Sequence, residues 1–143
     1  SESQLTSNHG WDTKANITFL TDVVGRFNEV GIRTSIFVDP DPVMVEYAAK
    51  AGAKRVELYT EPYASGYLID REKAIAPFIA AANMAREMGI GLNAGHDLSL
   101  VNLNYFYKMI PWTDEVSIGH ALICDALYMG LKSTIQEYLE CLK

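Results

Sequence analysis

One glutamate and one histidine stand where acid–base chemistry would need them. Glu57 lies inside the apolar run Arg55–Thr60. A carboxylate there must either form a pair or face an open cavity, because a lone buried charge is unfavourable. His96 follows Gly95 at the end of another apolar run, and imidazole gains and loses protons near neutral pH. Together the two side chains predict proton transfer to and from a bound substrate.

Each of these residues also has a purely structural explanation. Glu57 could bond to Lys54, to Arg55 or to a neighbouring backbone group at a strand end. His96 could be a helix-start histidine that bonds to nearby backbone. Asp97 beside it fits the N-cap of the helix expected to follow, because aspartate is a favoured capping residue.

A phosphate site is indicated by Gly119 and His120, which follow the last apolar run and come directly before an expected helix. Backbone N–H groups and the dipole at a helix N-terminus favour a bound anion. The alternative at this position is an ordinary glycine turn.

The polar segment 6–12 leads into the first expected helix. The Thr6 hydroxyl could bind a substrate, although a solvated loop end explains the segment better, and His9 is expected on the surface. The three histidines of the chain lack the spacing typical of metal ligands, so the sequence predicts no metal site.

Four short β-rich runs alternate with longer segments of helical period, a pattern typical of α/β folds. Gly31, Gly52 and Gly89 favour helix ends, because glycine readily adopts a left-handed backbone. The expected strands are Arg33–Asp39, Arg55–Thr60, Ile90–Gly95 and Glu115–His120. The expected helices are Asp12–Glu29, Asp41–Ala51, Asp70–Met88 with a candidate kink at Pro77, Leu98–Met109, Ala121–Met129 and Leu131–Leu142.

This order predicts parallel strands joined by right-handed crossovers. Strand starts about twenty to thirty residues apart match the β-α unit of a (β/α)8 TIM barrel, of which four units are half. A doubly wound sheet is the rival architecture, but the chain has no G-x-G-x-x-G fingerprint. In a barrel the strand ends carry the chemistry, which is where Glu57, His96 and Gly119 lie.

Composition excludes several other classes of protein. The net charge of −6 leaves no basic stripe for nucleic acid, and no apolar run approaches the length needed to span a membrane. Cys124 and Cys141 have neither zinc-site nor disulfide-scaffold spacing, so reduced thiols are expected. The chain begins Ser-Glu-Ser-Gln without Met or a signal peptide, so we expect an upstream segment.

Four segments resemble, in order and spacing, the later strands of the pyridoxine 5'-phosphate synthase family. The most specific part is Asn93-Ala-Gly-His96 followed by Ile118-Gly-His-Ala121, and Tyr128–Lys132 adds support. The other matching segments are Ser35–Asp39 and Val56–Thr60. The resemblance covers essentially the whole chain.

The resemblance implies that residues 1–143 are the C-terminal part of a single barrel domain, containing strands five to eight. The family condenses 1-deoxy-D-xylulose 5-phosphate with 3-amino-2-oxopropyl phosphate to form pyridoxine 5'-phosphate, inorganic phosphate and water. No metal or organic cofactor is expected. The resemblance also implies a cytoplasmic homo-oligomer that needs its upstream strands, so we expect the 143 residues alone to be inactive.

By position, the resemblance makes His96 the proton donor and Glu57 the carboxylate that stabilises the transition state. Gly119 and His120 match contacts to a substrate phosphate, and Thr6 matches a hydroxyl that contacts deoxyxylulose phosphate. Asp97 falls at a substrate-binding position where the family usually has glycine, and its charge would repel a phosphate there.

Two rival functions remain open on the sequence. One is a half-barrel that binds a phosphorylated metabolite without catalysis. The other is a different phosphate-binding barrel enzyme, such as an aldolase or isomerase, although no strand-end lysine suggests Schiff-base chemistry.

Overall fold

The computed structural model describes residues 7–143 and contains a single parallel sheet with strands in the order β1-β2-β3-β4. The strands are β1 (Ser35–Val38), β2 (Arg55–Tyr59), β3 (Gly91–Gly95) and β4 (Glu115–Ser117). All four expected strands are therefore confirmed. The last one was predicted too long, because His120 is already the first residue of a helix.

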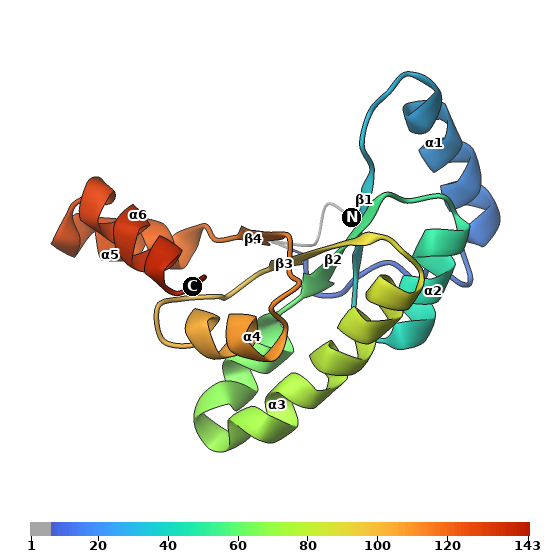
Figure 1. Cartoon of the computed structure of the whole chain (residues 1–143). Coiled ribbons are helices and arrows are strands. Elements are labelled where there is room, and N and C mark those ends of the chain that lie inside the picture. The colour runs from blue at the N-terminus through green and yellow to red at the C-terminus, as the bar shows by residue number, and fades with distance from the viewer. Residues whose placement is uncertain (1–6) are drawn as a thin grey trace.

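Helices cover one face of this sheet and extend beyond its β4 edge. They are α1 (Ile17–Glu29), α2 (Pro42–Lys50), α3 (Glu61–Glu87), α4 (Leu103–Met109), α5 (His120–Met129) and α6 (Leu131–Glu140). Figure 1 shows α2, α3 and α4 along the sheet, with the α5–α6 pair standing apart at its far end. None of the helices in residues 7–143 is both long and apolar enough to cross a membrane.

Local signals explain where most helices begin and end. The Asp41 side chain accepts a hydrogen bond from the Val43 amide, and Pro42 occupies the first helical position of α2. Gly31, Gly52 and Gly89 all have positive φ values after α1, α2 and α3. The predicted glycine ends of these helices are confirmed.

The predicted helix Asp70–Met88 matches the second part of α3, but the sequence did not predict a first helical part that begins at Glu61 and joins it across a kink at Asp70. Its backbone leaves helical values at Asp70 rather than at Pro77, and the Asp70 carboxylate accepts from the Lys73 amide as the cap of the second part. The first part forms because Tyr63 is fully buried there, packed edge-on against other aromatic rings. This tertiary packing carries no local sequence signal.

The two faces of the sheet differ in chemistry, because alternate residues of a strand point to opposite sides. One face is apolar and packs against the helices, and its side chains are buried. The other face is polar. The apolar face consists of Ile36, Val38, Val56, Leu58, Leu92 and Ala94, and the polar face carries Arg55, Glu57, Asn93 and Glu115.

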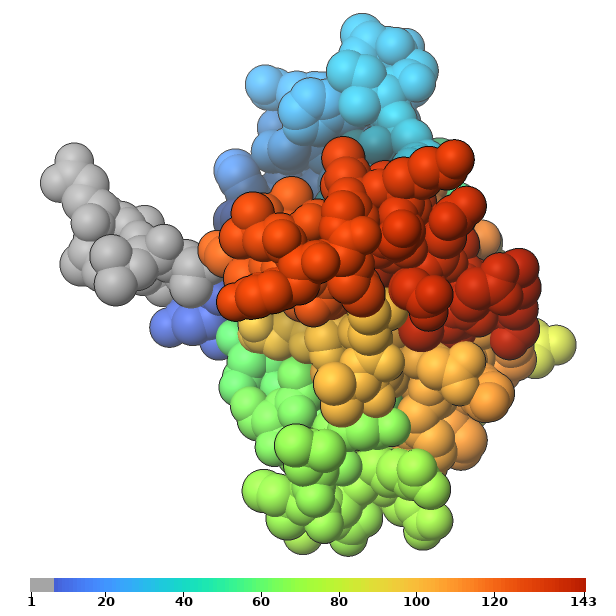
Figure 2. Space-filling model, turned by 90° about the vertical axis from the view of Figure 1, so that its left-hand side faces the viewer, coloured from blue at the N-terminus to red at the C-terminus, as the bar shows by residue number. Residues whose placement is uncertain are grey.

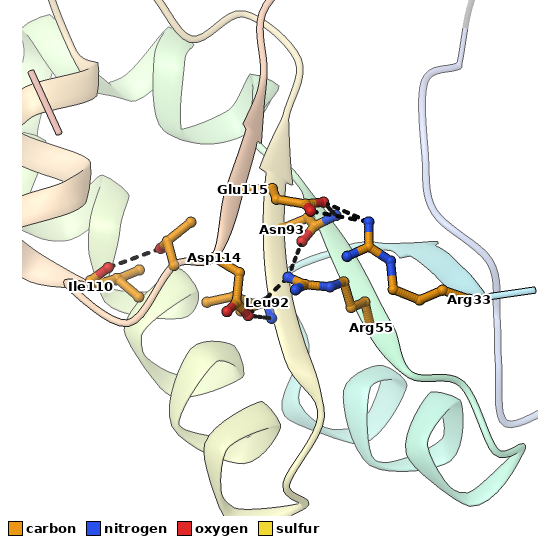
Figure 3. A network of polar contacts seen from close by, with 8 residues as sticks. Arg33, Arg55, Leu92, Asn93, Ile110, Asp114 and Glu115 are labelled. Carbon is orange, nitrogen blue, oxygen red and sulfur yellow. Dashed lines mark hydrogen bonds and ion pairs between the residues drawn. The ribbon is translucent and has the colours of Figure 1, made fainter. Parts of the chain in front are cut away.

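An ion pair shows how the polar face is shaped. Arg33, just before β1, donates to both carboxylate oxygens of Glu115 on β4, at 3.0 and 3.2 Å (Figure 3). Strands one and four of a flat sheet lie roughly 14 Å apart, given about 4.8 Å between neighbours. Contact between the two outer strands therefore favours a sheet that curls around its polar face.

Candidate functional site at the carboxyl edge of the sheet

An open cleft of about 840 Å³ lies where the strands end and is bounded by the loop that precedes α1. It brings together side chains from β1, β2, the residue that follows β3, the start of α2 and that loop. Its lining consists of Ser7, Asn8, His9, Gly10, Trp11, Asp12, Asn16, Phe37, Asp39, Asp41, Met44, Glu57 and His96. Glu57 and His96, singled out separately in the sequence, thus meet in one cavity.

Glu57 projects from the polar face of β2 and is half-buried. Among residues 7–143 its carboxylate has no hydrogen-bond or ion-pair partner, so the expected alternative of a bond to Lys54 or Arg55 is not what the structure adopts. Arg55 instead donates to Asn93 at 3.0 Å and pairs with Asp114 at 3.0 Å. Glu57 therefore faces the cleft as an uncompensated carboxylate.

Gly95 provides the space that the Glu57 carboxylate fills. The two residues lie on neighbouring strands, with Tyr59 paired to Gly95 in the register. A Cβ atom at position 95 would stand only 2.1 Å from Glu57 Oε1. Any side chain on residue 95 would displace the carboxylate from its place in the cleft.

His96 follows β3 directly and packs in an aromatic cluster. Its ring centroid lies 5.4 Å from that of Phe37 and 5.1 Å from that of Tyr59. Burial raises the pKa of the Tyr59 phenol, and nearby carboxylates raise it further, so this ring stays neutral at physiological pH. In the described part of the chain no group hydrogen-bonds to the imidazole, and its orientation depends on backbone and ring packing.

The backbone at His96 and Asp97 is left-handed, with φ values of 81° and 55°. These are the only non-glycine residues with positive φ among residues 7–143. The predicted helix N-cap at Asp97 was therefore wrong. Asn102 occupies the position before α4, which begins at Leu103 rather than Leu98. The polypeptide turns sharply off β3 before this helix can start.

A network of charges stabilises the polar face below the cleft. Figure 3 shows Arg55 between Asn93 and Asp114, while Asn93 also donates to Glu115 at 2.9 Å. The hydrogen bond from Arg33 lowers the pKa of the Glu115 carboxyl below its ordinary value. The network neutralises both arginines and leaves neither of them for Glu57.

The predicted phosphate contacts lie elsewhere on the same edge. Gly119 precedes α5 and His120 opens it, two and three residues beyond Ser117, which pairs with Gly95. Both are exposed and neither lines the cleft. Thr6 lies outside the described residues. Within residues 7–143 no cluster of histidine, cysteine and acidic side chains is arranged to hold a metal ion.

Asp39 and the loop around Gly10 are site features that the sequence did not reveal. The Asp39 carboxylate accepts from the Gly10 amide at 2.9 Å, and the Trp11 amide donates to the Phe37 carbonyl at 2.8 Å. Gly10 is buried so tightly that a Cβ would lie 2.3 Å from the Val38 backbone. Two features of the sequence could have indicated this contact: Gly10 in the polar segment before α1, and Asp39 at the end of the first apolar run.

The structure is that of an α/β protein whose parallel sheet has a cleft at its carboxyl edge, lined by a carboxylate and an imidazole. The family model described as pyridoxal phosphate biosynthesis protein PdxJ matches residues 1–143, and the chain belongs to this family. Its fold is also similar to a chain in the crystal structure of the Amycolatopsis orientalis BexX/CysO complex. That likeness has a TM-score of 0.59 at 18% identity and covers 92% of this chain and 50% of the other.

Several curated relatives named pyridoxine 5'-phosphate synthase are similar to the chain. The Bacteroides thetaiotaomicron protein is 72% identical over 99% of this chain and 60% of its own length. The Cytophaga hutchinsonii protein is 61% identical over 97% of this chain and 58% of its own. The chain thus spans about 60% of the length of these relatives.

The left-handed backbone at residue 97 gives a first prediction. Asp97→Gly and Asp97→Ala both remove the carboxylate, but only alanine keeps a Cβ that clashes at positive φ. We expect the alanine variant to be less stable than the glycine variant by about 1 kcal/mol. Urea unfolding of the full-length protein measures the difference, and equal free energies of unfolding would contradict the left-handed conformation.

Proposed function

We propose that this chain is the C-terminal part of a pyridoxine 5'-phosphate synthase. The complete enzyme would condense 1-deoxy-D-xylulose 5-phosphate with 3-amino-2-oxopropyl phosphate, releasing inorganic phosphate and water. The observation that carries the proposal is that Glu57 on β2 and His96, which directly follows the neighbouring strand β3, line one cleft. Membership of the PdxJ family and the names of its relatives supply the reaction.

We propose further that residues 1–143 form strands five to eight of a single (β/α)8 barrel domain. The strands are parallel and consecutive, as barrel strands are. The polar face, around which the Arg33–Glu115 pair favours curling, would become the barrel interior. Further strands upstream of this chain would complete the barrel in this proposal, which agrees with the chain's span of about 60% of its relatives' length.

In the proposed reaction His96 is the proton donor and Glu57 stabilises the transition state. Imine formation, dehydration and ring closure all move protons on and off oxygen and carbon, which requires positioned acids and bases. An unpaired carboxylate and an imidazole in the same cleft support these roles. A Glu57 paired with Arg55 would have its charge neutralised and would be less able to stabilise a developing positive charge.

The substrate phosphates are proposed to bind outside the acidic cleft. Gly119 and His120 begin α5, whose first turn has no side-chain cap, so its N–H groups are available to an anion. Thr6 is retained as a proposed contact to deoxyxylulose phosphate. Asp97 lies at a proposed substrate-binding position, where its charge favours the uncharged part of a substrate over a phosphate.

We also propose that the enzyme is a cytoplasmic homo-oligomer that uses no cofactor. Cys124 and Cys141 are both free thiols, which suits a reducing compartment. Leu127 and Tyr128 on α5 are 80% and 92% exposed, and Figure 2 shows the α5–α6 pair on the outside of the molecule. Exposed apolar side chains of this kind support contact with another copy.

The acid–base roles predict the behaviour of two variants of the full-length protein. His96→Asn and Glu57→Gln should each lower kcat by roughly 10²-fold or more, with a smaller change in KM, because general acid–base groups act mainly in the transition state. Glu46→Gln is the matched control, since Glu46 is paired with Lys50 on α2 and lies outside the cleft lining. Steady-state kinetics of pyridoxine 5'-phosphate formation measure the effect.

Two outcomes of this experiment would contradict the proposal. Unchanged kcat in His96→Asn would return His96 to a structural role. Calorimetric binding of 1-deoxy-D-xylulose 5-phosphate by the full-length protein, with no product formed, would identify a binding protein in place of an enzyme.

The close approach of Gly95 to Glu57 predicts a further variant. Gly95→Ala should push the carboxylate aside and lower kcat by roughly tenfold or more, because small misplacements at a reacting centre are costly. Gly25→Ala in α1 is the control, because an added Cβ there would meet no atom within 4 Å and the residue does not line the cleft. Equal kcat values in the two variants, at comparable melting temperatures, would refute the positioning of Glu57 by Gly95.

A further inference from the structure

Thr60 follows β2 and precedes α3, at the position where a threonine ordinarily caps a helix. Its side chain makes no capping hydrogen bond to α3. The hydroxyl instead donates to the Gly95 carbonyl at 2.7 Å and is shared with the His96 carbonyl, while the Thr60 amide also donates to Gly95 O at 2.8 Å. The residue is completely buried. Its hydroxyl and amide are thus committed to the strand end that precedes His96, while its carbonyl accepts from the Ala64 amide of α3.

The turn after His96 is held from its other side as well. The Asn102 side chain donates to the Asp97 carbonyl at 3.1 Å, and the Tyr63 hydroxyl donates to the Asn102 carbonyl at 2.7 Å. Asn102 is 5% exposed and Tyr63 is fully buried. Buried hydrogen bonds of this kind are strong local constraints, because leaving either partner unpaired is unfavourable.

A left-handed backbone at two successive non-glycine residues persists only where its surroundings impose it. At His96 the carbonyl is bound by Thr60, and at Asp97 the carbonyl is bound by Asn102. The imidazole has ring packing but no hydrogen bond within residues 7–143, so the direction in which it enters the cleft depends on this backbone. Loss of the Thr60 contact would therefore allow the His96 backbone to change conformation and its imidazole to change direction.

We propose that Thr60 is a positioning residue that fixes the His96 backbone and thereby aims the imidazole into the cleft. This inference rests on the proposed function for its effect on turnover, but the contact itself can be tested without any assay of catalysis. Thr60 touches no substrate in the proposal and acts only through His96.

Variants of the full-length protein at position 60 separate the hydroxyl from the side-chain volume. Thr60→Val keeps the shape but loses the donor, and should lower kcat at least tenfold with KM nearly unchanged. Thr60→Ser keeps the donor and should recover most of kcat. Thr134→Val is the matched control, because Thr134 is also fully buried and donates to a glycine carbonyl, that of Gly130 at 3.0 Å in α6. It should leave kcat unchanged.

A double-mutant cycle tests whether Thr60 acts through His96. In a His96→Asn background, Thr60→Val should cause little further loss of kcat, because the group that it positions is gone. Additive losses would overturn the proposal, as would equal kcat values for Thr60→Val and Thr60→Ser. Thr60→Ala covers the case in which valine does not fold. If neither Thr60→Val nor Thr60→Ala folds while Thr134→Val does, Thr60 serves the stability of the fold and the proposal is overturned.

Amide hydrogen exchange distinguishes failure of this inference from failure of the proposed function. Thr60→Val should increase exchange in the peptide that spans residues 92–100, whereas Thr134→Val should not. Faster exchange in Thr60→Val, in a protein whose wild type has no synthase activity, would support the contact between Thr60 and His96 and reject the proposed function. Unchanged exchange in an active enzyme would reject the role of Thr60.

Discussion

Compensation of charge on the polar face of the sheet is the constraint on which the site depends. Arg55 is mostly buried there and pairs with Asp114, while Arg33 reaches across to Glu115. A mostly buried guanidinium such as that of Arg55 would destabilise the fold without a partner, so its pair with Asp114 is required once the arginine is present, whereas the exposed Arg33–Glu115 pair contributes less. They also determine what remains unpaired. Because both arginines are paired with other carboxylates, Glu57 remains without an ion-pair partner among residues 7–143.

Strand alternation and register place the remaining parts of the site. Glu57 and Tyr59 share the polar face of β2, and the register sets Tyr59 opposite Gly95 on β3. A slip of one residue would turn every polar side chain towards the helices, so burial of the apolar face fixes the register strongly. Within that register Gly95 leaves room for the carboxylate, and the next residue carries the imidazole. Burial of the apolar face of the sheet thus determines where Glu57 and His96 lie relative to the polar face.

The sequence predicted the features that depend on neighbours along the chain and missed those that depend on partners across the fold. The Asp41 cap and the glycine ends of three helices were predictable, because their hydrogen bonds and φ values are local. Asp97 was wrongly expected to cap a helix, because the conformation of this turn depends on hydrogen bonds from Asn102 and Thr60. Likewise, no local signal could tell whether Arg55 would pair with Glu57 or with Asp114, which directly precedes β4.

The charge of the cleft bears on how the two phosphorylated substrates of the proposed reaction would bind. Asp12, Asp39, Asp41 and Glu57 all line it, and the lining contributed by the described residues includes no lysine or arginine. Like charges a few ångströms apart repel appreciably in a partly buried site. A phosphate is therefore disfavoured beside Glu57 and favoured towards backbone amides, such as those that follow Gly119. This difference in electrostatic environment would orient a substrate with its phosphate away from the cleft and its carbonyl or amino end towards Glu57 and His96. The same carboxylates that disfavour a phosphate in the cleft would thus favour the reactive end of the substrate there.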